Sequence, residues 1–476
     1  MSWEVVIGIE IHVQLRTERK LFCGNRVVFG DAPNTHVCPV CLGLPGALPT
    51  VNPEAVRLAL RTALALDCTV HDRSVWARKN YFYPDLPKGY QISQFEEPLA
   101  TDGTLVFAGP DGPRTVRIHR IHMEEDAGKL IHDRVPGKSA VDLNRAGTPL
   151  VEIVTEPDLR SPADSRAFLG ALKQILEYVD VSDCNMEEGS LRADANISLR
   201  PVGSDTLGTK TEIKNVNSFS GIERALEIEI ARQREVLDAG GRIEQQTLLW
   251  DDHRGTVRPM RSKEESHDYR YFPDPDLPPL LIESEALDDA RAELPELPAA
   301  RRTRFMEAYA LSEYDAGVLT QARATAEYFE TVVQGARDAK LAANWVMGPV
   351  QALMNERGEA PERFPVGPSR IVEILELVKE GVVSDSAAKK VLALLPDDET
   401  PVREIVEREG LVQIRDTARL ETWVAEVLEA HPEEVDRYRA GEKKILGFLM
   451  GRVMGRSQGQ ADPRQVSELL RTGLDD

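Results

Sequence analysis

The first long run of the chain, from Glu4 to Leu15, alternates between apolar and polar side chains. Successive side chains of a β-strand point to opposite faces, so this alternation predicts a strand with one buried face. The apolar face would carry Ile9, Ile11, Val13 and Leu15, and the polar face Glu10, His12 and Gln14. Glu10 and His12 would lie about 7 Å apart along the strand, which suits two ligands of one hard or borderline cation. An edge strand whose polar face meets water is the alternative.

The composition is that of a globular protein. Of the 476 residues, 42% are hydrophobic and 29% are charged, which fits two or three domains. We expect a cytosolic protein, because apolar runs stay below the roughly 18 residues of a membrane span and the start lacks a signal-peptide pattern. Five cysteines do not indicate a disulfide framework. The net charge of −21 argues against indiscriminate nucleic-acid binding but leaves room for a local basic patch.

Residues 1–292 are predicted to form the first domain. One helix should begin at Ser161-Pro162, where the serine caps the helix and the proline occupies its first position. A second helix is expected over about residues 221–238, before two glycines. Most of the remaining sequence alternates as strands do. The predicted fold class is therefore α+β, with a large antiparallel-rich cradle at the amino-terminal end.

The sequence after this domain has helical patterns. The prolines between Pro273 and Pro298 predict a stiff linker and a domain boundary. We expect an all-helical domain over residues 293–400 and a helical tail over residues 401–476.

Three consecutive acids form a second candidate cluster. Glu124, Glu125 and Asp126 should stand at the end of a strand, where they repel one another unless a cation neutralises them. Together with Glu10 and His12 they predict a Mg²⁺ site that would bind the phosphates of a nucleotide. A solvated turn is the alternative.

A segment rich in aromatic and basic residues runs from Arg78 to Gln91. Its candidate binding residues are Lys79, Tyr81, Tyr83 and Lys88. Such rings can stack on a base while the lysines meet phosphates. Prolines at 84 and 87 predict an ordered loop rather than a strand, and a packed aromatic loop is the alternative. A similar run over residues 269–276 is expected to cover the same side of the sheet.

The segment over residues 190–200 alternates strictly and predicts another strand. Its polar row consists of Arg192, Asp194 and Asn196. Together with similar fragments near Asp142 and Glu212, this row predicts the floor of a polar binding cradle, and a solvated sheet face is the alternative. The sequence has no Gly-x-x-x-x-Gly-Lys-Ser/Thr loop, so any nucleotide is held in another way. We also identify no nucleophile for amide hydrolysis.

A cysteine knuckle, Cys38-Pro-Val-Cys41, follows Cys23. Structural zinc takes four ligands, and Asn25 stands where a fourth cysteine could sit. His36 could complete the set, whereas reduced buried thiols are the alternative.

The tail has a basic segment from Arg437 to Gln460. Its candidate phosphate contacts are Lys443, Lys444, Arg452 and Arg456. Glycines at 447, 451 and 455 would share one helical face, for close approach to RNA or for tight helix packing. Asp462-Pro463 should cap a final helix.

Four segments resemble the B subunit of the bacterial tRNA-dependent amidotransferases. They are Gly-Ile-Glu-Ile-His-Val-Gln-Leu (8–15), Pro-Asn-Thr-His-Val-Cys-Pro-Val-Cys-Leu-Gly-Leu-Pro-Gly (33–46), Lys-Asn-Tyr-Phe-Tyr-Pro-Asp-Leu-Pro-Lys-Gly-Tyr (79–90) and Leu-Arg-Ala-Asp-Ala-Asn (191–196). The resemblance covers the chain and includes a YqeY-like helical tail at its end. It implies one member of a heterotrimeric enzyme, whose partners would be a glutaminase and a small protein, known as the A and C subunits. The substrates would be mischarged Asp-tRNA(Asn), Glu-tRNA(Gln) or both.

The resemblance also implies ATP and Mg²⁺ as cofactors. The γ-phosphoryl group would pass to the substrate's side-chain carboxylate, and ammonia would displace it. The Mg²⁺ ligands would be Glu10, His12, Glu124 and Glu125, of which Glu10, His12 and Glu125 would carry the activation. The nucleotide or the aminoacyl end would be bound by Lys79, Tyr81, Tyr83, Lys88, Arg192, Asp194 and Asn196. Asn25 departs from the four-cysteine zinc site of some relatives and leaves zinc doubtful. A non-catalytic tRNA-binding scaffold is the competing interpretation.

Overall fold

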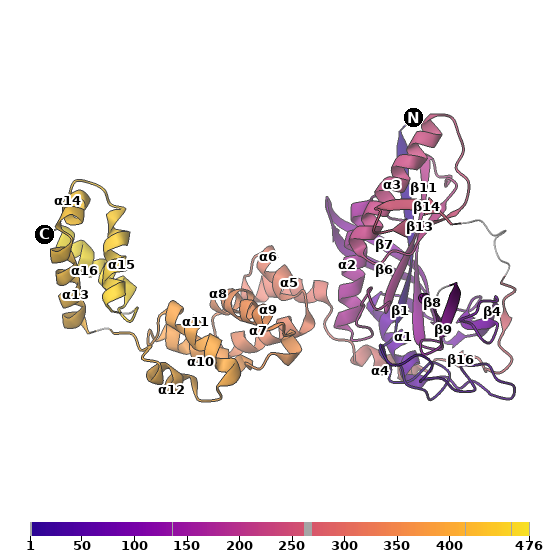
Figure 1. Cartoon of the computed structure of the whole chain (residues 1–476), viewed down its shortest axis with the longest axis horizontal. Coiled ribbons are helices and arrows are strands. Elements are labelled where there is room, and N and C mark those ends of the chain that lie inside the picture. The colour runs from indigo at the N-terminus through magenta and orange to yellow at the C-terminus, as the bar shows by residue number, and fades with distance from the viewer. Residues whose placement is uncertain (1, 136, 261–268, 415, 458, 476) are drawn as a thin grey trace. The chain divides into compact units, whose positions relative to one another are not determined.

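The computed structural model describes residues 2–135, 137–260, 269–414, 416–457 and 459–475. The chain forms two compact units, residues 1–298 and 299–476 (Figure 1). The first unit contains the sheets, and the described part of the second is helical. This arrangement of a large sheet and separate helices confirms the predicted α+β class.

A nine-stranded sheet forms the centre of the first unit. In spatial order its strands are β14 (Thr256–Pro259), β13 (Thr247–Asp251), β12 (Thr211–Lys214), β11 (Leu191–Pro201), β1 (Trp3–Gln14), β10 (Pro149–Thr155), β7 (Gly112–Glu125), β6 (Ala100–Gly109) and β2 (Thr69–Val70). Strand β1 pairs antiparallel with β10 on one side and with β11 on the other. The predicted alternation therefore lies on an interior strand rather than on an edge strand.

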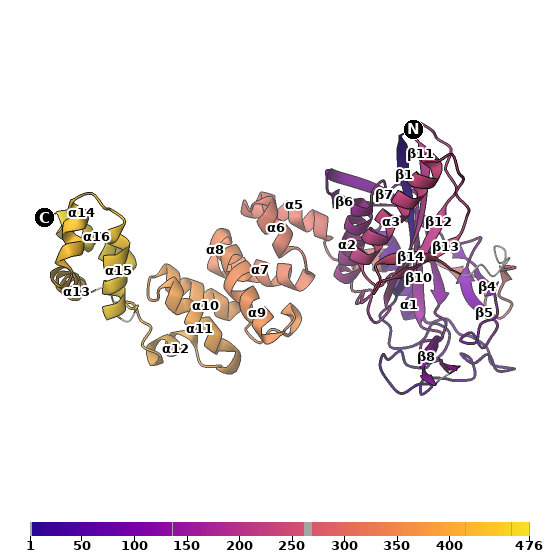
Figure 2. The ribbon, with the colours of Figure 1, turned by 45° about the horizontal axis from the view of Figure 1, so that its top comes forward.

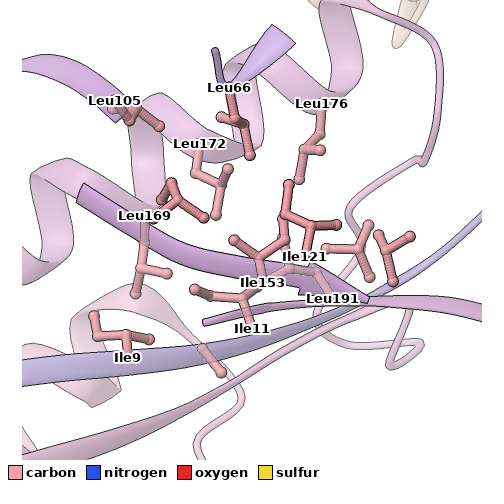
Figure 3. Close-up of a cluster of buried hydrophobic side chains, with 14 of the residues drawn as sticks. Ile9, Ile11, Leu66, Leu105, Ile121, Ile153, Leu169, Leu172, Leu176 and Leu191 are labelled. Carbon is pink, nitrogen blue, oxygen red and sulfur yellow. The ribbon is translucent and has the colours of Figure 1, made fainter. Parts of the chain in front are cut away.

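The apolar face of this sheet packs against helices. Helices α1 (Pro53–Ala65), α2 (Pro162–Tyr178) and α3 (Phe219–Asp238) contribute to one core with β1. Isoleucines from three neighbouring strands gather against leucines of α2 in Figure 3: Ile11, Ile121, Ile153, Leu169 and Leu172. All five are at most 1% exposed, and burying each such side chain contributes about 1.5–3 kcal/mol of transfer free energy. The opposite face of β1 is left for polar side chains.

Helix starts follow the predicted caps. The Ser161 hydroxyl accepts a hydrogen bond from the amide of Asp164 at 3.0 Å, which confirms the start of α2. Helix α3 begins at Phe219, two residues earlier than expected, because the Ser218 hydroxyl caps it by accepting from the Gly221 amide.

A small three-stranded sheet corrects one prediction. Strand β4 (Trp76–Asn80) pairs with β5 (Tyr90–Gln94) and with β15 (Phe272–Pro273). Lys79 is therefore in a strand rather than in a loop, because the two prolines interrupt only residues 81–89. Other short pairs are β3 (Arg73–Ser74) with β16 (Leu280–Leu281), and β8 (Lys129–Val135) with β9 (Lys138–Asp142).

The proline-rich segment, predicted to be a stiff linker, packs as part of the first unit. It contains helix α4 (Ser284–Ala292), whose Ala290 is 1% exposed within the core of the sheet unit. Glu293 forms an ion pair with Arg57 of α1. Leu294 and Leu297, each directly before one of the last two prolines, also pack against this core. Prolines alone did not reveal these contacts, which come from residues distant in the sequence.

The described part of the second unit consists of helices (Figure 2). Their buried side chains form two separate cores. The first core is built from α5 (Pro298–Tyr309), α6 (Glu313–Leu319), α7 (Arg323–Ala336), α8 (Ala339–Trp345), α9 (Gln351–Arg357), α10 (Pro368–Lys379), α11 (Asp385–Leu394) and α12 (Val402–Arg408). The second is built from α13 (Thr417–Ala430), α14 (Pro432–Arg439), α15 (Ile445–Arg456) and α16 (Pro463–Asp475). The Asp462 carboxylate accepts from the Arg464 amide at 2.8 Å, which confirms the predicted start of α16.

Candidate metal and substrate site

Three adjacent strands place acids and imidazoles on the polar face of the sheet. The register pairs His12 of β1 with Glu152 of β10, and Glu152 with His122 of β7. Directly paired residues of antiparallel strands project to the same side, so these three side chains form a row. Glu124, two residues beyond His122 on β7, faces the same side.

His12, Glu124 and Glu152 together form a candidate cation site. His12 Nε2 lies 3.5 Å from Glu124 Oε1 and 3.4 Å from Glu152 Oε2. The ligand atoms of all three residues lie within 4.8 Å of one another. Glu124 Oε2 is buried and accepts no hydrogen bond from the described residues. Two carboxylates, one of them with an unused buried oxygen, and an imidazole fit a divalent cation such as Mg²⁺ that keeps some of its waters.

The residues of the cluster stabilise one another's charged forms. Burial alone would raise the pKa of Glu152, but His122 and His12 outweigh burial and hold that pKa well below its ordinary range. Burial alone would lower the pKa of His12, but Glu152 and Glu124 raise it above its ordinary value. A cation at this site would therefore take the place of a proton on His12.

Glu125 lies on the other side of β7 from Glu124. It forms an ion pair with Lys88, and its Oε1 accepts a hydrogen bond from the Ile92 amide at 2.9 Å. Consecutive strand residues cannot both face one cluster, so Glu125 and Lys88 instead connect the 81–89 loop to the sheet. Glu10 shares the face of His12 but is not among the three grouped ligands. Burial, followed by the charge of Glu152, raises the pKa of Glu10.

Glu152 is a site residue that the sequence reading missed. It is the one acid within the apolar run Pro-Leu-Val-Glu-Ile-Val-Thr (149–155). A single carboxylate inside a strand of β-branched and aliphatic residues is a usable signal, because charged groups are rarely buried without a partner.

The predicted polar row of β11 adjoins the cluster. Arg192 pairs with His12 across the strands, and its guanidinium donates to Asp126 Oδ2 at 3.1 Å. Burial would raise the pKa of Asp126, but Arg192 and Arg145 lower it below its ordinary value. Asp194 forms an ion pair with Lys214 at 2.9 Å. Asn196, the last member of the row, borders a neighbouring hollow.

Lys79 stands beside the acids within a group of aromatic rings. Its Nζ lies 5.1 Å from the ring centre of Tyr269, and the rings of Tyr81 and Tyr271 each lie 6.1 Å from that of Tyr269. Burial would lower the pKa of Lys79, but Glu124, Tyr271 and Glu152 outweigh it and raise that pKa. The charges of Glu124 and Glu152 therefore act on Lys79, and the Tyr81 ring belongs to the same aromatic group as Lys79.

Tyr83 lies apart from these groups. It is 60% exposed, and its neighbour Phe82 is 83% exposed, so both rings face solvent in the 81–89 loop. Of the four residues predicted in this segment, Lys79 and Tyr81 lie in the aromatic group with Tyr269, Lys88 pairs with Glu125, and Tyr83 is on the surface.

The cysteines form a separate group with three sulfurs. The Sγ atoms of Cys23, Cys38 and Cys41 lie within 4.8 Å of one another. Asn25 Nδ2 donates toward Cys41 Sγ at 3.7 Å, and His36 Nε2 bonds Asp31 at 2.6 Å. Within the described residues, this set does not supply the four ligands of a closed zinc site. A hydrogen bond from Cys23 is the main factor that lowers the pKa of Cys41 to about 4 despite burial.

The predicted basic residues of the tail lie in α15 or directly before it. Lys443 Nζ stands 3.9 Å from the ring centre of Tyr438, the Arg452 guanidinium stands 4.9 Å from that of Phe448, and Arg456 pairs with Glu426. Lys444 is exposed. A Cβ added at any of the glycines 447, 451 or 455 would meet no described atom within 4 Å. Tight helix packing within the described chain therefore does not explain these glycines.

Searched over its described residues, the structure has no helix with both the length and the apolar character needed to cross a bilayer.

Two family models and several known proteins match the chain. The family described as GatB/GatE catalytic domain matches residues 5–288, and the family described as GatB domain matches residues 327–474. The chain is 53% identical over 476 residues to the B subunit of the aspartyl/glutamyl-tRNA(Asn/Gln) amidotransferase of Moorella thermoacetica, covering 100% of both proteins. It is 50% identical to the proteins of that name from Chlorobium luteolum, over 475 residues, and Geobacter sulfurreducens, over 477 residues, again covering 100% of both chains.

The grouping of acids makes a prediction about cation affinity. Glu152→Gln should weaken binding of Mn²⁺, used as a paramagnetic probe of the Mg²⁺ site, by at least about tenfold, because a charged ligand is lost. Glu125→Gln is the matched control, since that carboxylate faces Lys88 on the other side of β7. Titration of the full chain by electron paramagnetic resonance measures both. A larger loss of Mn²⁺ affinity in Glu125→Gln than in Glu152→Gln would contradict the grouping.

The three-sulfur group makes a second prediction. Asn25→Cys should supply the fourth ligand and raise zinc affinity by at least about tenfold, because closed four-ligand sites hold zinc best. Competition with a coloured chelator measures the affinity, and Asn52→Cys, at the start of α1, is the control for an added thiol. If the unmodified chain already retains zinc as tightly as the Asn25→Cys variant, three sulfurs suffice and the prediction is wrong.

Proposed function

The chain belongs to the family of aspartyl/glutamyl-tRNA(Asn/Gln) amidotransferase B subunits, and from this premise we propose that its sheet face activates a side-chain carboxylate with ATP. The substrate would be mischarged Asp-tRNA(Asn), Glu-tRNA(Gln) or both. The observation that carries the proposal is the cluster of His12, Glu124 and Glu152, with the ammonium of Lys79 among aromatic rings beside it.

The chemistry requires activation because a carboxylate is a poor electrophile. One carboxylate oxygen attacks the γ-phosphorus of ATP, the bond to the β-phosphate oxygen breaks, and ADP leaves. Ammonia then attacks the carbonyl carbon of the acyl phosphate, inorganic phosphate leaves with the bonding electron pair, and the amine loses a proton to give the amide. Charge repulsion between the carboxylate and the phosphates is the main barrier that a site must reduce.

The residues of the cluster suit this task. His12, Glu124 and Glu152 would hold Mg²⁺, which supplies neutralisation of phosphate charge when it is bound. Lys79 would hold the substrate carboxylate or the transferred phosphoryl oxygens, because its ammonium stays charged in this setting. Arg192 would add positive charge from β11, where Asp126 orients it.

The proposal includes partners. We propose that ammonia comes from a glutaminase, the A subunit of the same complex, because no hydrolytic nucleophile is predicted in this chain. A small C subunit would complete the assembly. The relatives are named as the B subunit of their enzyme, which supports an assembly of several subunits. The α15 surface, with Lys443, Lys444 and Arg452, would contact tRNA phosphates.

A scaffold that binds tRNA without catalysis is the second candidate. The open face of α15 favours this candidate, because tRNA could bind there without any reaction in the first unit. The two candidates differ in one respect. In a scaffold, neutralising single polar groups of the sheet would leave ADP release unchanged.

Replacing the charged groups of the cluster tests the proposal. In the assembled complex, Glu124→Gln and Lys79→Met should each lower ADP release that depends on mischarged tRNA by about 10²-fold, because each removes stabilisation of developing charge. Glutaminase activity of the partner should remain measurable. Lys129→Met, at an exposed position of β8, is the matched control. Undiminished ADP release in both cluster variants would favour the scaffold.

A further inference from the structure

The three-sulfur group is a chemical feature that the proposed function does not use. It lies in the segment between β1 and α1. Cys41 Sγ is 3.8 Å from Cys38 Sγ, and Cys23 Sγ lies within 4.8 Å of both. Among the described residues, Asn25 rather than a fourth cysteine turns its side chain toward Cys41. Because these ligands do not fit a closed zinc site, three thiols this close together require another explanation.

Cys38 and Cys41 stand at the two ends of one tight turn. The Leu42 amide donates a hydrogen bond to the Cys38 carbonyl at 3.0 Å, and the Gly43 amide donates to the Val40 carbonyl at 3.0 Å. The turn brings the two sulfurs to the same side of the backbone. A disulfide requires them to approach to about 2 Å, which rotation of the side chains can supply. Two cysteines separated by two residues are also the spacing of redox-active thiol pairs.

The surroundings of Cys41 are those of a reactive sulfur. Its Sγ accepts a hydrogen bond from the Cys38 amide at 3.0 Å, and the Asn25 side-chain amide donates toward it at 3.7 Å. Donors of this kind stabilise a thiolate, which is the nucleophilic form of cysteine. Cys41 is 5% exposed, whereas Cys38 is only partly buried, so an oxidant from solution reaches Cys38 more easily.

A fully buried lysine stands beside this pair. Lys20 is 0% exposed, and its Nζ donates to the carbonyls of His36 at 2.7 Å and Leu143 at 3.3 Å. A Cβ added at Gly147 would lie 3.4 Å from Lys20 Cδ and 3.9 Å from Cys41 Cβ, so the two side chains flank the same glycine. Among the described residues, the ammonium has carbonyl partners but no carboxylate partner. A nearby thiolate would offset the cost of burying this charge.

We propose that Cys38 and Cys41 form a reversible disulfide when the chain meets a hydroperoxide, of which hydrogen peroxide is the simplest. The site is therefore a place of thiol oxidation rather than a zinc knuckle. This inference is independent of the proposed function, because it uses no residue of the sheet face.

The reaction balances with one hydrogen peroxide for each disulfide. The Cys38 thiolate attacks one peroxide oxygen, the O–O bond breaks, and the leaving hydroxide takes a proton to form water. Cys38 is then a sulfenic acid. The Cys41 thiolate attacks its sulfur, the S–O bond breaks, and the second hydroxide leaves and also becomes water. A thiol reductant restores both cysteines by exchange.

Peptide mapping of the full chain tests the pairing. Trypsin cuts after Lys20, Arg26 and Arg57, so Cys23 lies on peptide 21–26 and both other cysteines lie on peptide 27–57. The reduced chain is treated with hydrogen peroxide, remaining thiols are blocked with N-ethylmaleimide, and the peptides are weighed by mass spectrometry. Peptide 27–57 should lose two hydrogens, take up no N-ethylmaleimide, and become available to it again after dithiothreitol.

Two buried thiols serve as internal references for the rate. Cys68 and Cys184 stand outside the three-sulfur group. Disulfide formation within peptide 27–57 should be at least about tenfold faster than oxidation of either reference, because these thiols are buried and have no neighbouring thiol.

Cys23→Ser is the matched variant, since it removes the third sulfur and keeps the turn. It should form the same disulfide at a rate within about twofold of the unmodified chain. If Cys23→Ser does not fold, the map of the unmodified chain decides by itself, because trypsin separates Cys23 from the other two cysteines.

Three results would overturn the inference. The first is a main product that joins peptide 21–26 to peptide 27–57, which would assign the disulfide to Cys23. The second is oxidation of Cys38 and Cys41 no faster than that of Cys68 and Cys184. The third is one tightly held zinc ion per purified chain that protects all three thiols from peroxide, which would make the group a metal site.

Discussion

The pleat of β1 divides its side chains between the core and the site, and both depend on the register with β10 and β11. A slip of one residue would exchange the two faces, placing His12 in the core and Ile11 at the polar surface. The cost of exposing Ile9 and Ile11, each at most 1% exposed, opposes such a slip. The same burial that stabilises the sheet therefore aligns His12 with Glu152 across the strands. The hollow lined by Gly8 and Asn196 also depends on this register, which pairs these two residues.

Burying the two carboxylates of the cation cluster costs free energy, and neighbouring polar and charged groups offset part of that cost. Glu124 and Glu152 are buried carboxylates within reach of one another, and burial of such charge is costly unless it is paired. His12 and His122 supply positive or donating groups, and Lys79 adds a charge beside aromatic rings. One oxygen of Glu124 still lacks a described partner. A site of this kind gains from a divalent cation and from the phosphates that such a cation attracts.

Local sequence patterns predicted the elements whose formation depends mainly on neighbouring residues. Alternation located β1 and β11, and the Ser161 cap located α2, because period and capping need no distant residue. Alternation places Glu124 and Glu125 on opposite sides of any strand, but the sequence could not show which of them faces His12, because that depends on the register of β7 with β10. Glu152 lies 140 positions from its partner His12, so their contact depends on sheet topology. Prolines near Lys79 and around α4 suggested loops where distant contacts form a strand and a packed helix.

We infer that this sheet face transfers a phosphoryl group to the substrate carboxylate, and isotope transfer tests this step most directly. Mischarged tRNA with ¹⁸O in its side-chain carboxylate would be amidated by the assembled complex with ATP, and the released inorganic phosphate would be examined by mass spectrometry. One labelled oxygen should move from the carboxylate to phosphate for each amide formed. Unlabelled phosphate, accompanied by normal amide formation, would contradict the acyl phosphate and the role given to the cluster.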